Sequence, residues 1–109
     1  MELSKRELDG VLIVTVNESR IDSAVAIRFK DMMRQLTENG PERVVLDLAH
    51  VDFIDSSGLG AIVGAMKLLG ADRRLDLSGL RDNVAKVFTL TRMDRVFRIH
   101  MSLSDALGG

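Results

Sequence analysis

Two adjacent serines stand between an apolar strand and a glycine-rich helix, where serine side chains could do chemistry. Ser56 and Ser57 follow Asp55 and precede the tripeptide Gly58-Leu59-Gly60. Three kinds of chemistry suit such a turn. A serine could act as a nucleophile, the glycines could hold a nucleotide phosphate, or a serine could be displayed for phosphorylation by another protein.

The nucleophile hypothesis lacks most of the residues that it needs. A hydrolase elbow has the pattern G-x-S-x-G, and neither serine has a glycine at both flanking positions. A general base is also scarce, because His50 and His100 are the only histidines. The sequence therefore does not favour serine hydrolase chemistry, and we expect no enzymatic activity.

The glycines support a nucleotide-binding hypothesis only in part. Gly58, Gly60 and Gly64 open a helix, and Asp76 follows where a ribose-binding acid would stand. However, a polar Asp-Ser-Ser turn precedes the first glycine, and 109 residues are too few for a two-halved dinucleotide fold. The alternative is that Gly60 and Gly64 let the helix pack closely on the sheet. We expect no cofactor, although this hypothesis stays open.

The third hypothesis starts from helix capping. Ser56 or Ser57 could cap the helix by accepting a hydrogen bond from a backbone N–H, as could Asp55. One cap needs one side chain, which leaves another hydroxyl free to face solvent. A phosphate there would meet the positive end of the helix dipole and, beside Asp52 and Asp55, would make the surface strongly negative. Such a modification would affect the stability of the fold little, but it would strongly affect the binding of a partner protein.

Composition argues against several other functions. Fifteen basic and 16 acidic side chains give a net charge of −1, with only Arg73-Arg74 as a basic cluster, so we expect no nucleic-acid binding. There is no cysteine, which excludes disulfides and thiol chemistry. The N-terminus lacks an apolar signal segment, and no apolar run reaches the roughly 18 residues of a membrane span. We expect one cytoplasmic domain over residues 1–109, not bound to a membrane, with no metal and a monomer when free.

Hydrophobic periodicity predicts the elements that hold the serine turn in place. Apolar runs predict five strands, at residues 2–8, 11–16, 43–48, 73–79 and 97–101. Apolar residues at helical spacing predict four helices, ending near residues 36, 69, 90 and 107, with candidate caps at Asp22 or Ser23, Ser56 or Ser57, Asp82 or Asn83, and Ser102 or Ser104. A tight turn at Asp9-Gly10 and β-α-β crossovers then predict an α/β fold with a mixed sheet of four to five strands.

Residues 44–64, V-V-L-D-L-A-H-V-D-F-I-D-S-S-G-L-G-A-I-V-G, resemble the signature of the STAS domain family, the anti-sigma factor antagonists. Residues 20–24 resemble the segment that opens the first helix of these proteins, although Ser19 stands where many relatives have glycine. Residues 87–97 and 102–107 resemble their later helix and their ending. The resemblance implies a single STAS domain whose helices pack mainly on one face of the sheet.

Members of this family switch partners, and the resemblance implies the same here. The unphosphorylated antagonist binds an ATP-dependent serine kinase that otherwise holds a sigma factor, and phosphorylation by that kinase releases it. A PP2C-type serine phosphatase reverses the modification. Ser56 matches the phosphorylated serine, with Ser57 as second choice. The residues expected to bind the partner are Asp22, Ser23, Asp55, Ser56, Ser57, Gly58 and Leu59.

The regulated output stays open at this point. Similar partner switches control sigma-factor release, secretion, or biofilm and extracellular-matrix production. A nucleotide-binding STAS domain and a STAS scaffold without phosphorylation are the alternatives.

Overall fold

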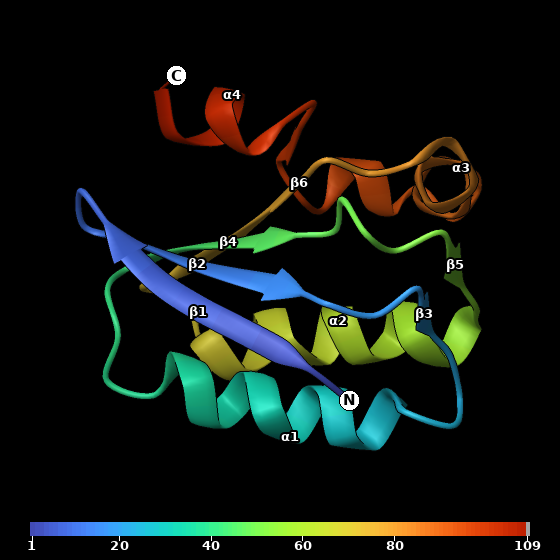
Figure 1. The fold of residues 1–109 in the computed structure, drawn as a ribbon, viewed down its shortest axis with the longest axis horizontal. Coiled ribbons are helices and arrows are strands. Elements are labelled where there is room, and N and C mark those ends of the chain that lie inside the picture. The colour runs from blue at the N-terminus through green and yellow to red at the C-terminus, as the bar shows by residue number, and fades with distance from the viewer. Residues whose placement is uncertain (109) are drawn as a thin grey trace.

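A five-stranded mixed sheet forms the centre of the computed structural model, which describes residues 1–108 (Figure 1). Its strands lie in the order β1-β2-β4-β6-β7, with β1 antiparallel to β2 and the other neighbours parallel. The strands are β1 (Leu3–Leu8), β2 (Val11–Val16), β4 (Arg43–Asp47), β6 (Arg74–Ser78) and β7 (Ile99–His100). The predicted mixed α/β sheet is confirmed, although its last strand is only two residues long.

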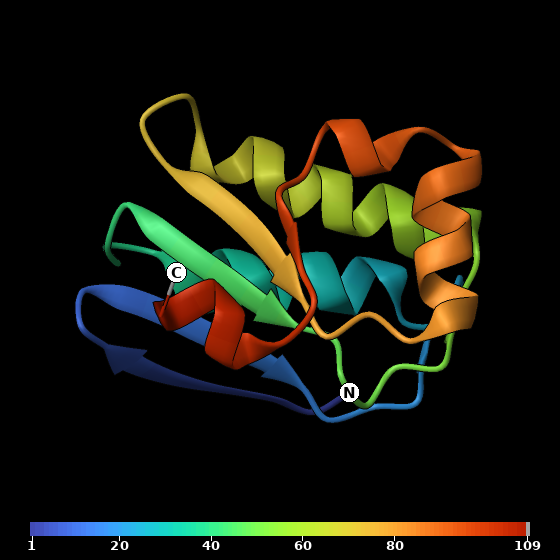
Figure 2. The same cartoon turned by 90° about the horizontal axis from the view of Figure 1, so that it is seen from above.

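Helices cover the two faces of this sheet unequally (Figures 1 and 2). The helices are α1 (Ala26–Thr37), α2 (Ser56–Leu69), α3 (Asp82–Leu90), α4 (Leu103–Gly108) and the short 3-10 helix η1 (Met93–Arg95). α1 and α2 lie side by side under one face and enclose the main core, whereas the short α4 covers part of the other face through Ala106. The prediction that the helices pack mainly on one face is confirmed. None of the helices within residues 1–108 is long and apolar enough to cross a membrane.

The turn between β1 and β2 has the backbone that its sequence predicts. Asp9 and Gly10 have φ angles of 52° and 77°, both in the left-handed region. Two such residues match the right-handed twist of the strands that they join, and Asp-Gly is a preferred pair for this purpose. The hairpin register pairs Leu8 with Val11, so the turn consists of Asp9 and Gly10 alone.

A second, two-stranded sheet lies at one end of the fold. β3 (Arg20–Ile21) runs parallel to β5 (Phe53–Ile54), with Arg20 opposite Phe53 and Ile21 opposite Ile54. β3 follows β2 and precedes α1, while β5 follows β4 and precedes α2. The pair therefore holds the beginnings of the two large helices next to each other (Figure 1).

The predicted side-chain caps of α1 and α3 are wrong, and that of α4 is confirmed. α1 begins at Ala26 with no side-chain cap, and Asp22 and Ser23 lie in the turn before it. α3 begins at Asp82 itself, also without a side-chain cap, so this carboxylate lies in the first turn, where the helix dipole favours it. The cap of α4 is confirmed, because Ser102 Oγ accepts a hydrogen bond of 3.1 Å from the amide three residues later.

Gly60 and Gly64 do not bring α2 onto the sheet, so that interpretation of these two glycines is wrong. A Cβ at Gly64 would lie 3.0 Å from Cε of Lys30, so this glycine faces α1. A Cβ at Gly60 would have no neighbour within 4 Å, and the residue is exposed. The close approach of α2 to another element occurs in its first turn, at Gly58.

Candidate functional site

The first turn of α2 is capped by Asp55. Its Oδ1 accepts a hydrogen bond of 2.8 Å from the Gly58 amide, and its backbone is extended, as an N-cap requires. Of the caps that the sequence allows, Asp55 is therefore confirmed, and Ser56 and Ser57 are wrong. Both serines are exposed, and neither hydroxyl forms a hydrogen bond with another of the described residues.

The same carboxylate fastens the turn that precedes α1. Oδ2 of Asp55 accepts a hydrogen bond of 3.0 Å from the Ser23 amide, 32 residues away in the sequence. The Asp55 amide in turn donates to the Ile21 carbonyl at 3.4 Å. These contacts bring Asp22 and Ser23 next to the serine turn.

Backbone amides keep the Asp55 carboxylate charged. The hydrogen bond from Gly58 lowers the pKa of Asp55 most, partial desolvation opposes it, and the amides of Ser23 and Ser57 lower the pKa further. The pKa of Asp55 is therefore below its ordinary value. A negative charge next to the serines is a permanent feature of this surface at neutral pH.

Gly58 and Leu59 support this surface from below. A Cβ at Gly58 would lie 2.0 Å from the Ile21 carbonyl oxygen, so no other residue allows α2 to approach β3 this closely. Leu59 is 9% exposed and belongs to the main core. Of the seven residues expected to bind a partner, the exposed or half-buried ones form what we call the serine surface: Asp22, Ser23, Asp55, Ser56 and Ser57.

Arg20 and Phe53 border the serine surface and were not anticipated from the sequence. The Arg20 guanidinium lies 4.2 Å from the centre of the Phe53 ring, and its Nε lies 3.3 Å from Asp22 Oδ2. Phe53 is 38% exposed, which is unusual for a phenylalanine in a small sheet. Arg20 on β3 lies opposite Phe53 on β5. Each of these strands has only two residues, which is too few to show an alternation of apolar and polar residues in the sequence.

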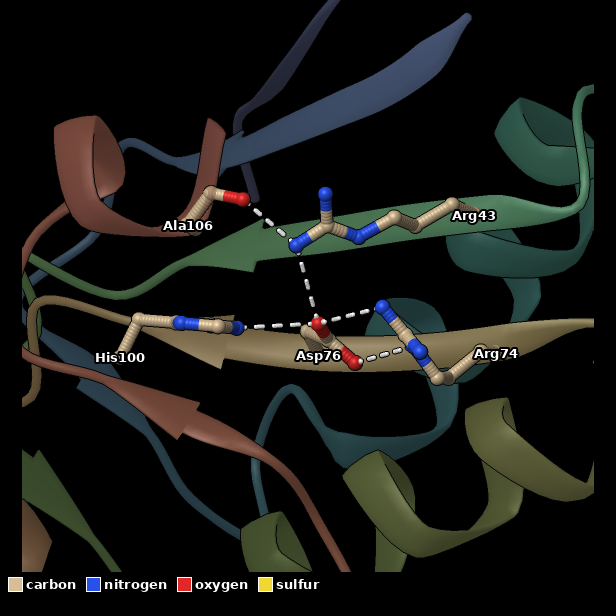
Figure 3. A network of polar contacts seen from close by, with 5 residues as sticks. All are labelled: Arg43, Arg74, Asp76, His100 and Ala106. Atoms are coloured by element: carbon tan, nitrogen blue, oxygen red, sulfur yellow. Dashed lines mark hydrogen bonds and ion pairs between the residues drawn. The ribbon is translucent and has the colours of Figure 1, made fainter. Parts of the chain in front are cut away.

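Asp76, the candidate ribose-binding acid, is fully buried on β6 (Figure 3). Its carboxylate lies 2.9 Å from Arg74 Nε, 3.2 Å from an Arg43 nitrogen and 3.0 Å from His100 Nε2. Burial acts to raise the pKa of Asp76, but the hydrogen bonds from His100 and Arg43 and the charge of Arg74 outweigh it and lower the pKa below its ordinary value. Asp76 is therefore engaged in a structural ion cluster. It is not available to bind a ribose, which weakens the nucleotide-binding hypothesis.

The Asp76 cluster joins four elements of the fold (Figure 3). Asp76 lies on β6, Arg43 on β4 and His100 on β7, and the Arg43 guanidinium also donates to the Ala106 carbonyl of α4 at 2.5 Å. These bonds hold the short last strand and last helix against the sheet. Within residues 1–108, no three His, Cys, Asp or Glu side chains gather as a metal ion would require.

Comparison with known proteins agrees with the resemblance in the sequence. A family model described as the STAS domain matches residues 2–106. The anti-sigma-B factor antagonist of Listeria monocytogenes is 30% identical over 100 residues, covering 91% of this chain and 86% of the relative. The crystal structure of an anti-sigma factor antagonist from Mycobacterium paratuberculosis superposes with a TM-score of 0.87 at 25% identity, covering 98% of this chain and 91% of the other. SpoIIAA in its unphosphorylated form shares the fold, with a TM-score of 0.77 at 17% identity over 97% of this chain and 93% of the other.

Proposed function

Because this chain belongs to the STAS domain family, we propose that it acts as an anti-sigma factor antagonist that changes partners when it is phosphorylated. The unphosphorylated form binds an ATP-dependent serine kinase of the anti-sigma type through the serine surface. Phosphorylation of Ser56 releases that partner, and a PP2C-type serine phosphatase restores the binding form. The protein catalyses no reaction in this scheme.

One observation carries the proposal: Asp55 caps α2, so both serine hydroxyls of the first turn are exposed and available to a kinase. Had either serine been the cap, its hydroxyl would be engaged with a backbone amide and partly shielded. The carboxylate also holds Ser23 beside this turn, so the partner meets a surface whose backbone is already ordered.

A phosphate on Ser56 would change the surface more than the fold. Ser56 is the first residue of α2, and the positive end of the helix dipole favours an anion there. The phosphate would add about −1.5 to −2 charges beside Asp22, Asp52 and Asp55. The serine surface would then be strongly anionic, and a partner that had packed against neutral hydroxyls would have to bury this charge.

The free energy that phosphorylation must supply to release the partner is modest. A thousandfold loss of affinity corresponds to about 4 kcal/mol. Leaving a desolvated charge without a partner at an interface costs several kcal/mol, so a single dianion at Ser56 is sufficient.

The test is the mass of the protein purified from its own cells, with the modified residue mapped in peptide fragments. We expect one added phosphate on Ser56, absent from Ser56→Ala and present in the matched control Ser57→Ala. Phosphate on Ser57 alone would move the role to the neighbouring hydroxyl. An unmodified protein under every growth condition would contradict the switch.

The partner is then captured with the same variants as bait. Ser56→Ala is expected to retain an ATP-dependent serine kinase, and Ser56→Asp to lose it, while both variants stay folded. Retention of the kinase by Ser56→Asp and wild type alike would argue against release by charge.

A further inference from the structure

Four arginines from two separate segments of the sequence line one cleft of the protein. The cleft lies between the beginning of β6 and the segment that leads from η1 into β7, and it has a volume of about 420 Å³. Its lining residues are Met66, Arg73, Arg74, Leu75, Asp76, Arg95, Val96, Phe97 and Arg98. In Figure 2, β6 and the segment that leads into β7 diverge from the place where the two strands pair, and α2 passes behind them.

The cleft is open because the pairing of β6 with β7 is short. Only Leu77 and Ser78 of β6 are paired, and the Leu77 amide donates to the Arg98 carbonyl at 2.9 Å. Backbone groups of alternate residues in a strand point to the same edge, so the Leu75 amide also faces β7. The later segment has already turned away at that level, which leaves the Leu75 amide directed at the cleft.

The charges in the cleft are poorly balanced by the protein itself. Its lining contains four arginines and one aspartate, a sum of +3, in a chain with a net charge of −1. Asp76 forms an ion pair with Arg74, but the same carboxylate also bonds to Arg43 and His100 outside the cleft. Its negative charge is therefore shared among three partners. Among the described residues, no carboxylate lies within 4 Å of the other three lining arginines, Arg73, Arg95 and Arg98.

Arginines that line one cleft provide groups that bind oxyanions. An arginine presents its N–H groups as a planar fork that matches the oxygens of phosphate or carboxylate, and low-dielectric walls strengthen the attraction. The apolar side chains of Met66, Leu75 and Phe97 provide such walls. A volume of this size lies in the range of small-molecule sites, which is roughly 300 to 1,000 Å³.

We propose that this cleft binds a compact polyanion, whose phosphate or carboxylate oxygens are held by Arg95 and Arg98. Arg73 contributes only its positive charge, because its Nε donates to the Pro41 carbonyl at 3.0 Å. A singly charged ion would leave most of the positive charge unbalanced, so the ligand carries two or more negative groups. The site is separate from the serine surface: Met66 follows Ser56 by ten residues of α2, about 15 Å along the helix. The proposal therefore does not depend on the proposed switch.

The test is titration of the full chain with inorganic tripolyphosphate and, in parallel, with citrate, followed by calorimetry and by amide shifts in NMR spectra. We expect saturable binding of at least one of the two anions, with shifts concentrated in residues 73–76 and 95–98 and including the Leu75 amide. Tighter binding of tripolyphosphate identifies phosphate as the preferred group, and tighter binding of citrate identifies carboxylate; either result supports the site.

A pair of double variants separates this cleft from general charge. Arg95→Gln with Arg98→Gln removes two exposed arginines of the cleft and is expected to weaken binding about tenfold or more. Lys5→Gln with Arg6→Gln removes the same charge from exposed positions of β1 and is expected to leave the affinity nearly unchanged. No saturable binding of either anion, or an equal loss in both double variants, would overturn the proposal.

Discussion

The Ser23 amide donates a 3.0 Å hydrogen bond to the Asp55 carboxylate across 32 residues of sequence. The second oxygen of the same carboxylate accepts from the Gly58 amide at 2.8 Å. One side chain therefore starts α2 and fastens the turn before α1. The two halves of the serine surface are ordered with respect to each other before any partner arrives, which reduces the entropy lost on binding.

Replacing Asp55 by asparagine should loosen both contacts. An asparagine has one acceptor oxygen instead of two, so either Ser23 or Gly58 loses its hydrogen-bond partner. We expect a lower melting temperature and faster hydrogen exchange at one of these two amides. Asp52→Asn is the matched control, because it removes an exposed charge three residues away that caps nothing. Equal exchange rates in the two variants would show that the carboxylate has no ordering role.

Two glycines of α2 should respond in opposite ways to alanine. Gly58→Ala places a Cβ 2.0 Å from the Ile21 carbonyl oxygen, so α2 must move away from β3, at a cost of about 2 kcal/mol or more in the free energy of unfolding. Gly60→Ala meets no atom and should stabilise the helix by about 0.5 to 1 kcal/mol. Chemical denaturation of the two variants measures both values. Similar changes in both would contradict the close approach at Gly58.

Local signals in the sequence predict most of the fold. The turn residues Asp9 and Gly10 and the long apolar runs are such signals, and the hairpin and crossovers follow from them. β3 and β5 could not be predicted, because strands of two residues show no alternation. They pair because the segments that follow β2 and β4 pass side by side at the end of the main sheet.

The candidate site shows a similar division between local and long-range causes. Asp and Ser are almost equally good caps, so their order in the turn does not tell which one caps α2. The Asp55 carboxylate also accepts from the Ser23 amide, which only the fold brings within reach. The arginine cleft is likewise invisible in the sequence, since residues 73–74 and 95–98 meet only through the pairing of β6 with β7.

A negative charge at Ser56 should leave the fold intact. Ser56→Asp puts a carboxylate in the first turn of α2, where the helix dipole favours it, although Asp55 is adjacent. We expect the free energy of unfolding to change by less than about 1 kcal/mol relative to Ser56→Ala. Urea denaturation of both variants gives this difference. A large destabilisation would mean that loss of partner binding by Ser56→Asp reflects unfolding and not charge.

The Asp76 cluster should make stability depend on pH in a particular direction. The pKa of Asp76 is lowered in the folded protein, so its carboxylate contributes stability above its ordinary pKa of about 3.9 and loses that contribution as the pH falls through the folded value. In Asp76→Asn, Arg43, Arg74 and His100 lose their anionic partner, and we expect a loss of about 3 kcal/mol at pH 7.

The difference between wild type and Asp76→Asn should therefore shrink on acidification. Urea denaturation at pH 7, 5 and 2 measures it. The value is largest at pH 7 and smallest at pH 2, because below its ordinary pKa the Asp76 carboxylate binds a proton in the unfolded chain and the folded state loses this advantage. Asp31→Asn serves as the control, because Asp31 pairs with Arg34 on the exposed surface of α1 and such pairs contribute little. A difference for Asp76→Asn that stays constant from pH 7 to pH 2 would show that the cluster stabilises the fold by packing, and not by the charge of its carboxylate.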